Sequence, residues 1–229
     1  MDRSAYVVEG LCTHVAAGSR WRESSLCIID FETTGRDAST DRILEIGIVC
    51  VENGYCTHRY EQLINPGIPV PEESRAIHGI TDEMLANAPT FASAWENVMS
   101  MLSGRIPVAY NAAFDRAFLL AETQRADVAF DLVAPALDES VVWIDPLVWA
   151  RELFKYEKGK KLTDMCKRLN ITLDNAHRAS GDAEAAWRVL VAMATKLPDR
   201  YDDLIRLQTQ YAERQAAEFT AWRARMRGT

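Results

Sequence analysis

The sequence predicts an α/β domain in which helices cover both faces of a mixed sheet. Two observations lead to this prediction. Apolar runs in the first third of the chain are short and rich in branched residues, as in strands, and Asn53-Gly54, a two-residue turn signal, lies between two of them. From residue 91 onward, apolar residues repeat about every 3.6 positions, as in helices, with short strand-like runs between them. A hairpin followed by alternating strands and helices gives a sheet with parallel and antiparallel pairs.

Five strands are expected, at residues 26–31, 43–51, 55–64, 106–109 and 141–144. The first ends at the turn-like sequence 30–35, and the second and third flank the Asn53-Gly54 turn. The fifth ends at Asp145-Pro146. Prolines 66, 69 and 71 predict a loop after the third strand.

Helices are expected at residues 91–102, 111–125, 147–154, 162–169 and 182–195. Thr90, which follows a proline, is placed to cap the first of them. The second is expected to bury Phe114, Ala117, Phe118 and Ala121. The last is expected to bury Ala183, Ala186, Trp187 and Leu190.

The chain of 229 residues, 48% of them hydrophobic, is long enough for one sizeable domain. That domain is expected at residues 26–196, with an N-terminal extension at 1–25 and a helical C-terminal extension at 197–229. The chain has 26 Lys and Arg and 33 Asp and Glu, which gives a net charge of −7. This charge argues against a protein that binds nucleic acid over a broad basic surface, but it does not exclude one that binds nucleic acid at a local site.

Five cysteines without a CxxC pair fit neither a disulfide framework nor a zinc site. The chain also has no signal-peptide core and no apolar run of membrane-spanning length. We therefore expect a cytoplasmic protein that does not bind membranes.

Acidic residues lie at three strand ends or helix starts. Asp30 and Glu32 are two residues apart at the end of the first strand, so that both side chains point to one face and can share divalent cations. Asp115 lies in the first turns of the helix after the fourth strand, and Asp182 opens the last predicted helix. Taken singly, each also fits an ordinary role in a solvated turn or at a helix start.

Together, these residues form three motifs. Their order and spacing are Asp30-x-Glu32-Thr33-Thr34-Gly35, then Asn111-x-x-Phe114-Asp115, then His177-x-Ala179-x-x-Asp182. This pattern resembles the exonuclease motifs of the histidine-containing branch of the DEDD superfamily, which includes the proofreading epsilon subunit of DNA polymerase III, ribonuclease T and oligoribonuclease. The resemblance covers about residues 26–196 and implies a ribonuclease H-like fold with a five-stranded mixed sheet. Tyr110 departs from the pattern, because histidine is frequent at this position in the family.

The resemblance implies two Mg²⁺ or Mn²⁺ ions as cofactors. Asp30 is expected to bind both ions, Glu32 and Asp182 one of them, and Asp115 the other, largely through water. Without cations, four converging carboxylates would repel one another and raise their own pKa values. His177 is expected to be the general base, since the ordinary pKa of histidine suits proton removal near neutral pH.

The expected reaction is stepwise 3′→5′ hydrolysis of single-stranded DNA ends to nucleoside 5′-monophosphates. Thr33 and Thr34 would receive the terminal sugar, and His78 and Phe114 are candidates for contacting the last bases. Two alternatives stay open. One is an exoribonuclease of the ribonuclease T or oligoribonuclease kind, and the other is a non-catalytic module that binds nucleic acid or a protein partner.

Several residues allow two interpretations each. Phe114 fits a core position as well as base stacking, and Glu45 fits either a core acid or a residue supporting the site. The basic run at 155–168 is either a solvated helix face or a track for phosphates. The C-terminal stretch carries apolar residues at helical spacing, which either dock on the core or bind a protein partner or a second copy as a homodimer.

Overall fold

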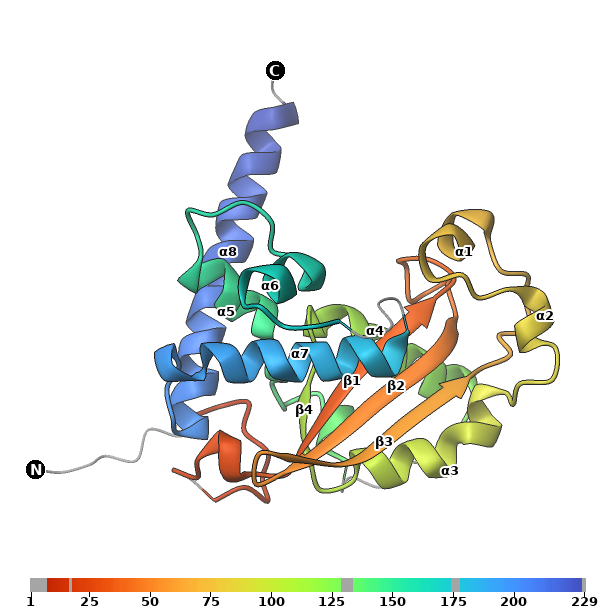
Figure 1. Cartoon of the computed structure of the whole chain (residues 1–229), viewed down its shortest axis with the longest axis horizontal. Helices are drawn as coiled ribbons and strands as arrows, with labels where there is room; N and C mark the ends of the chain where they lie inside the picture. Colours follow the sequence, from red (N-terminus) through yellow and green to blue (C-terminus); the bar gives the residue numbers. More distant parts are fainter. Residues whose placement is uncertain (1–7, 17, 129–133, 174–177, 228–229) are drawn as a thin grey trace, which may run out of the picture.

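A mixed sheet forms the centre of the computed structural model, which describes residues 8–16, 18–128, 134–173 and 178–227 (Figure 1). The strand order is β3-β2-β1-β4. The strands are β1 (Leu26–Thr33), β2 (Ile43–Glu52), β3 (Tyr55–Leu63) and β4 (Ile106–Val108). β1 and β3 both pair antiparallel with β2, and β4 pairs parallel with β1. Asn53 and Gly54 both have positive φ, 50° and 81°, so the predicted two-residue turn between β2 and β3 is confirmed.

The expected fifth strand is wrong, because the described residues form a sheet of four strands. Residues 141–144 contribute only an isolated parallel bridge, between Val108 and Ile144. The Val142 amide donates instead to the Gly10 carbonyl, at 2.8 Å, and Pro146 begins a helix two residues after Ile144. Pairing with β4 therefore ends after a single bridge.

Helices cover both faces of the sheet, as predicted. Leu26 and Ile28 of β1 face a core built with α5 (Pro146–Leu153), α6 (Leu162–Arg168), α7 (Ala179–Met193) and the beginning of α8 (Tyr201–Arg227). Cys27 and Ile29 face the opposite core, built with α3 (Phe91–Leu102) and α4 (Ala112–Arg125). Successive residues of β1 thus supply two separate cores, as the two-residue period of a strand requires.

The inward residues of the last predicted helix, now α7, are all buried, and Thr90 caps α3 by accepting a hydrogen bond from the Ser93 amide at 3.2 Å. The expectation for α4 is partly wrong. Phe118 is buried as expected, but Ala117 is exposed, and the helix buries Leu119 and Glu122 as well. Burial of the charged Glu122 is made possible by its ion pair with Arg42, at the end of the loop after β1.

The segment after the third strand is not entirely a loop. It contains the short helices α1 (Glu72–His78) and α2 (Asp82–Leu85), which lie beside the end of the sheet (Figure 1). Proline disfavours the helical conformation at its own position and at the residue before it, but not at the residues that follow. A helix can therefore begin directly after Pro71, as α1 does. Thr81 caps α2 by accepting from the Met84 amide.

Segments near both ends of the described chain, around Trp21 and in the first part of α8, pack on the domain. Trp21, in the short 3-10 helix Trp21–Glu23, is fully buried, and its ring meets that of Trp187 edge to face at 6.4 Å. Tyr201 and Gln208 of α8 are buried as well, whereas the last turns of α8 project from the body (Figure 1) and expose Trp222. Two further 3-10 helices span Pro135–Leu137 and Ala194–Lys196. None of the described helices combines the length and apolar character needed to cross a membrane.

Candidate active site

Three carboxylates meet where β1 passes under α7. Asp30 and Glu32 follow Ile28 on the face of β1 that packs against this helix. Asp182 lies in the first turn of α7. One carboxylate oxygen from each of the three residues lies within 4.8 Å of the others. The two predicted motifs, which are about 150 residues apart in the chain, are therefore brought together.

A glycine permits this approach. Gly47 of β2 lies opposite Asp30 in the sheet, directly under the start of α7. A Cβ atom at this position would lie 2.1 Å from the carbonyl carbon of Ala179 and 2.3 Å from the amide of Ser180. Both are backbone atoms and cannot turn away. The absence of a side chain at Gly47 thus lets the first turn of α7 lie on the sheet next to Asp30.

Asp115 reaches the same region from the other side of the sheet. It lies in the first turn of α4, which begins shortly after β4 ends. Because β4 stops opposite Ile28, the backbone of β1 beyond that point is not paired by β4. Asp115 fills this place, and its Oδ1 accepts a hydrogen bond from the Phe31 amide at 3.2 Å. Asp115 is thereby fixed next to the strand that carries Asp30 and Glu32.

The electrostatics of the site disfavour ionised carboxylates. Burial raises the pKa of Asp30 well above its usual range, and the charges of four neighbouring acids raise it further. Burial, together with the charges of Asp182 and Glu45, raises the pKa of Glu32 to about 7. The pKa of Asp115 is also raised, chiefly by burial. Clustered oxygen donors with raised pKa values fit a hard divalent cation, which would restore their ionised forms.

Glu45 has a different environment from these acids. It is fully buried, and its carboxylate accepts hydrogen bonds from Arg178 Nε at 2.9 Å, Arg178 Nη2 at 2.5 Å and the Ala179 amide at 3.0 Å. Arg178 also contacts Glu61 of β3 at 2.7 Å, and Glu61 accepts a hydrogen bond from Ser180. Glu45 and Glu61 thus tie the first residues of α7 to the sheet and thereby hold Asp182 in place.

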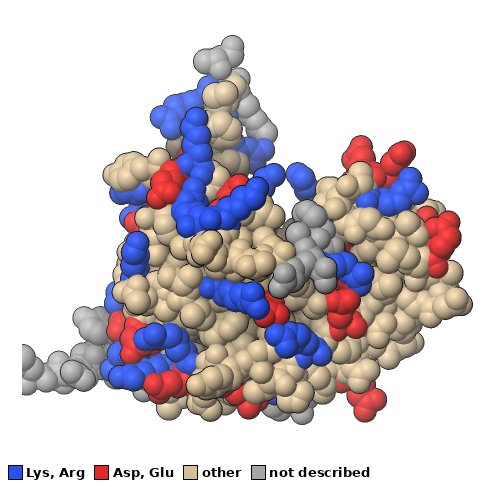
Figure 2. All heavy atoms as spheres, viewed as in Figure 1, with Lys and Arg blue, Asp and Glu red and all other residues tan. Residues whose placement is uncertain are grey.

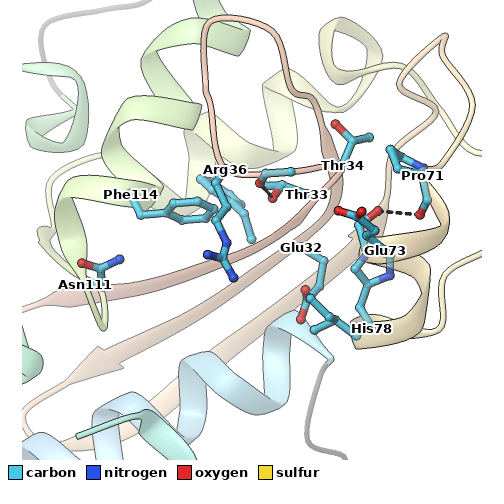
Figure 3. A pocket seen from close by; sticks show the side chains of 13 residues that line it. Glu32, Thr33, Thr34, Arg36, Pro71, Glu73, His78, Asn111 and Phe114 are labelled. Atoms are coloured by element: carbon cyan, nitrogen blue, oxygen red, sulfur yellow. Dashed lines mark hydrogen bonds between the residues drawn. The ribbon is translucent and has the colours of Figure 1, made fainter.

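A cavity of about 830 Å³ adjoins the carboxylates (Figure 3). Asn111 and Phe114 lie on one side of it and α1 on the opposite side, with Glu32 between them. It is lined by Phe31, Glu32, Thr33, Thr34, Gly35, Arg36, Pro71, Glu73, Ser74, Ile77, His78, Asn111 and Phe114. All four substrate-contact candidates from the sequence therefore line this cavity.

The side chains of these candidates have partners of their own. Thr33 Oγ1 donates to the Gly35 carbonyl at 2.6 Å, and Thr34 Oγ1 bonds with Asp41 and accepts from the Arg42 amide. The two hydroxyls therefore shape the turn after β1. In α1, the His78 Nδ1 accepts from the Ile80 amide at 3.0 Å.

Phe114 combines the two interpretations that the sequence left open. Its ring packs against that of Phe118 with centroids 4.8 Å apart, so one side belongs to the core. The side chain is half-buried, and it lines the cavity. The predicted base, His177, lies outside the described residues.

Sequence reasoning missed two residues at this site. Arg36, directly after the first motif, brings a cation to the cavity. Asp145 accepts hydrogen bonds from the amides of Asn111 and Ala112, at 3.0 and 3.1 Å, and from that of Leu147, at 2.8 Å. One buried carboxylate thus holds the starts of α4 and α5 together. The Asp-Pro pair was the available signal, since Asp before an N-terminal proline often begins a helix.

Comparisons with known proteins agree with this geometry. A family model described as exonuclease, RNase_T, matches residues 27–190. The DNA polymerase III PolC-type of Bacillus cereus is 34% identical over 171 residues, which are 75% of this chain and 11% of the relative. The 3′-5′ exonuclease DinG of Bacillus subtilis is 32% identical over 171 residues, 74% of this chain and 18% of the relative. The chain thus spans less than a fifth of the length of either relative.

Among solved structures, that of exonuclease X in complex with 5′ overhanging duplex DNA is similar, with a TM-score of 0.58 and 26% identity. The match covers 80% of this chain and 99% of exonuclease X. The fold of most of this chain therefore has a counterpart in nearly the whole of a solved exonuclease chain.

Proposed function

The chain belongs to the RNase_T exonuclease family, and on that basis we propose that it is a 3′→5′ exonuclease that shortens single-stranded DNA and releases nucleoside 5′-monophosphates. The observation that carries the proposal is the group formed by Asp30, Glu32 and Asp182 beside an open cavity. Buried acids that face one another are costly to a fold, so their presence at a cavity is best explained by chemistry.

We assign the four acids as ligands of divalent metal ions, two in number. Asp30, Glu32 and Asp182 would supply the main oxygen donors, and Asp115 would support the second ion beside Asp30. When bound, Mg²⁺ or Mn²⁺ supplies the positive charge that stabilises a phosphodiester during hydrolysis. Glu32, with its pKa raised to about 7, would lose its proton on binding the ion.

His177 is the proposed general base, which takes a proton from the attacking water. Its neighbour in the chain, Arg178, is held by two carboxylates, those of Glu45 and Glu61. This anchoring would restrict the backbone at residue 178 and so limit where the imidazole of His177 can reach. Glu45 and Arg178 are therefore proposed as positioning residues for the base and for Asp182.

The cavity suits the end of a single strand. The backbone turn shaped by Thr33 and Thr34 would receive the terminal sugar, and the exposed side of Phe114 would support the last base. His78, from α1, would contact the strand across the cavity. Arg36 is placed to meet a phosphate. We favour DNA because one relative is a DNA polymerase and exonuclease X was solved with DNA.

The test is incubation of the purified chain with end-labelled DNA and RNA oligonucleotides of matched sequence in Mg²⁺ and in Mn²⁺. A ladder of products shortened from the 3′ end is expected, with DNA degraded faster. Degradation of RNA alone would replace the DNA assignment by an exoribonuclease. No degradation of either polymer would overturn the exonuclease proposal.

A matched pair of variants tests the assigned ligands. Asp182→Asn removes one proposed ligand charge, and Glu213→Gln removes an exposed acid of α8 far along the chain from the three motifs. Only the first is expected to abolish degradation. Calorimetric titration with Mg²⁺ provides a second measurement. A chain that binds no divalent ion, even with a nucleoside monophosphate present, would instead be a binding module.

A further inference from the structure

A second cavity, of about 460 Å³, adjoins the active-site cavity. Asn111, at the start of α4, lines both of them. The second cavity is otherwise lined by Tyr110, by residues of α5 and by the segment that leads into α6. A polymer leaving the active-site cavity past Asn111 would therefore enter the second cavity directly.

The lining of this second cavity is strongly basic. Arg151 extends from α5, and Lys160 and Lys161 precede α6. None of the described residues that line it is acidic, although the chain as a whole carries a net charge of −7. Arg151 and Lys161 are exposed, and neither forms an ion pair with another residue in the described part of the chain. Three cations thus line a hollow whose described lining contains no acid, and the neighbouring negative charges are Asp145 near Arg151 and Glu157 and Asp164 near Lys160.

Figure 2 shows that basic and acidic side chains are also separated on the surface of the molecule. Lys and Arg side chains gather over the part of the molecule where α6 and α8 lie, whereas Asp and Glu gather over α1 and α2. In this view, the largest group of basic side chains therefore lies on the side of the molecule where α6 and α8 lie. An anionic polymer is expected to leave the site in that direction.

Hydrogen bonds hold the two lysines in place. The Tyr110 hydroxyl donates to the Lys160 carbonyl at 2.5 Å, which joins the end of β4 to the segment before α6. Arg168 donates to the carbonyls of Gly159, at 3.0 Å, and Lys158, at 2.7 Å. The Lys161 amide donates to Asp164 at 3.2 Å. A segment fixed in this way loses little conformational entropy when it binds an anion.

We propose that this second cavity binds a backbone phosphate of the same strand whose 3′ end occupies the active site. The proposal rests on the proposed function, because that function places a 3′ end next to Asn111. Arg151 and Lys161 would contact the phosphate, and Tyr110 would act as a positioning residue through Lys160. Of the basic run at 155–168, this interpretation selects the two lysines that line a hollow and leaves the others as solvated charges.

The choice of phosphate follows from the donors. Arginine and lysine side chains are the usual contacts for phosphate oxygens, and a guanidinium can donate two parallel hydrogen bonds to one such group. Among the described residues that line the cavity, Tyr110 alone is aromatic and its hydroxyl is already bonded, so the cavity is poorly suited to stacking several bases. The contact between the second cavity and the strand would therefore not depend on the base sequence of the nucleic acid.

The first experiment measures binding of a fluorescent DNA 12-mer by anisotropy, in Mg²⁺ and in a His177→Ala background that keeps all four proposed metal ligands. Arg151→Gln and Lys161→Gln are each expected to weaken binding about tenfold, the usual effect of removing one charged hydrogen bond. Each should also reduce the slope of log affinity against log salt by about 0.7, the amount expected when one phosphate of a single strand is no longer neutralised. Arg151→Lys should recover part of the affinity.

Lys196→Gln serves as the matched control. It removes the same charge from a side chain that lies over the Phe154 ring and does not line the second cavity. Its affinity and salt slope should equal those of the background protein. If Arg151→Gln and Lys161→Gln bind DNA like Lys196→Gln, the second cavity is not a phosphate site and the proposal fails.

The second experiment locates the phosphate. A neutral methylphosphonate is placed at each internal linkage of the 12-mer in turn. One position near the 3′ end should weaken binding about tenfold in the background protein, and the same substitution should have no further effect in Arg151→Gln. A penalty that persists in Arg151→Gln would overturn the proposal. These binding data do not require hydrolysis, so loss of the proposed function would show separately, as a wild-type chain that binds oligonucleotides without shortening them.

Discussion

Two groups of acidic residues lie inside this fold. The acids of one group pair with arginines, and those of the other lie close to further acids. Glu45 and Glu122 are buried and paired with arginines: Glu45 with Arg178, and Glu122 with Arg42 through two hydrogen bonds of 2.6 and 3.0 Å. The other group consists of the proposed metal ligands Asp30, Glu32, Asp115 and Asp182. Three of this group cluster within 4.8 Å of one another. We call the two groups the paired acids and the site acids.

The difference shows that the surroundings of a buried carboxylate decide whether it stabilises the fold or serves the reaction. A buried carboxylate with an arginine partner satisfies its charge within the chain and ties distant segments together. Carboxylates gathered beside one another raise each other's pKa values, as for Asp30 and Glu32, and are stabilised only by an added cation. Removing a paired acid should therefore damage the fold, whereas removing a site acid should damage the reaction.

The largest effect is expected for Asp30→Asn. Turnover should fall on the order of 10⁴-fold, the scale seen when a central catalytic group is removed. The metal-free protein should be at least as stable as the wild type, because a neutral amide avoids the cost of burying a carboxyl group whose pKa is raised among other acids. Oligonucleotide degradation and urea unfolding in EDTA measure the two quantities. A large loss of stability in EDTA would place Asp30 among the paired acids.

Sequence reasoning reached the site acids because the chemistry fixes their identity and spacing. Asp30 and Glu32 are adjacent on one strand face, and their motif could be read without knowing the fold. Asp182 comes close to them because Gly47 admits α7, a packing detail that no local pattern contains. The spacing of the motifs thus predicted which acids meet, and the glycine explains how.

The paired acids were largely beyond sequence reasoning. Glu122 and Arg42 lie 80 residues apart, and neither belongs to a motif. The same limit applies to the expected fifth strand at residues 141–144, which forms only the isolated bridge between Val108 and Ile144. Its pairing was not predictable, because Val142 bonds to Gly10 near the other end of the chain. Long-range pairing decides such cases, and a local pattern carries no information about it.

Glu122→Ala is expected to give the largest loss of stability. It would leave Arg42 without its bidentate partner in a mostly buried position, and breaking a buried pair in this way costs about 3–5 kcal/mol. Arg42 also donates to the Pro66 carbonyl, so the loop after β3 should loosen as well. Urea unfolding measures the change. A loss below about 1 kcal/mol would show that the paired acids do not stabilise the fold.

The pH dependence of metal-free stability tests the site acids as a group. The pKa of Glu32 is about 7 in the folded chain and 4.5 ordinarily. Because the pKa of Glu32 is raised in the folded chain, protonated Glu32 contributes fully to folding stability below about pH 4.5. This contribution is lost as the pH rises through 7. For Glu32 alone this amounts to about 3 kcal/mol, and Asp30 shifts in the same direction.

Unfolding in EDTA should therefore become easier between pH 5 and pH 8, and saturating Mg²⁺ should abolish most of that change. The matched control is Glu32→Gln, which lacks the titrating group and should show a flatter pH profile in EDTA. Equal pH profiles for the wild type and Glu32→Gln would mean that repulsion among the site acids does not reach Glu32.

Gly47→Ala tests whether close packing of α7 is what assembles the site acids. The added methyl group meets backbone atoms of Ala179 and Ser180, so the helix start must move. Overpacking of this kind costs about 1–3 kcal/mol. Because Asp182 moves with α7, activity should fall far more than stability does. The exposed Gly67→Ala, which meets nothing within 4 Å, controls for loss of glycine, although its positive φ adds some strain. Full activity in Gly47→Ala would show that the acids tolerate a displaced helix.

The smallest effect is expected for an ion pair at the surface. Arg59 and Glu184 join β3 to α7 at 3.0 Å, near the pair by which Glu45 of β2 holds Arg178, but the Arg59 side chain is 54% exposed. Solvent and salt screen such a pair, so Arg59→Ala should change the free energy of unfolding by less than about 1 kcal/mol. If it instead matched Glu122→Ala, burial would not distinguish the contributions of ion pairs in this fold. Adding 0.5 M NaCl sharpens the test, because it should remove what little Arg59 contributes and leave the pairing of Glu122 with Arg42 largely unchanged.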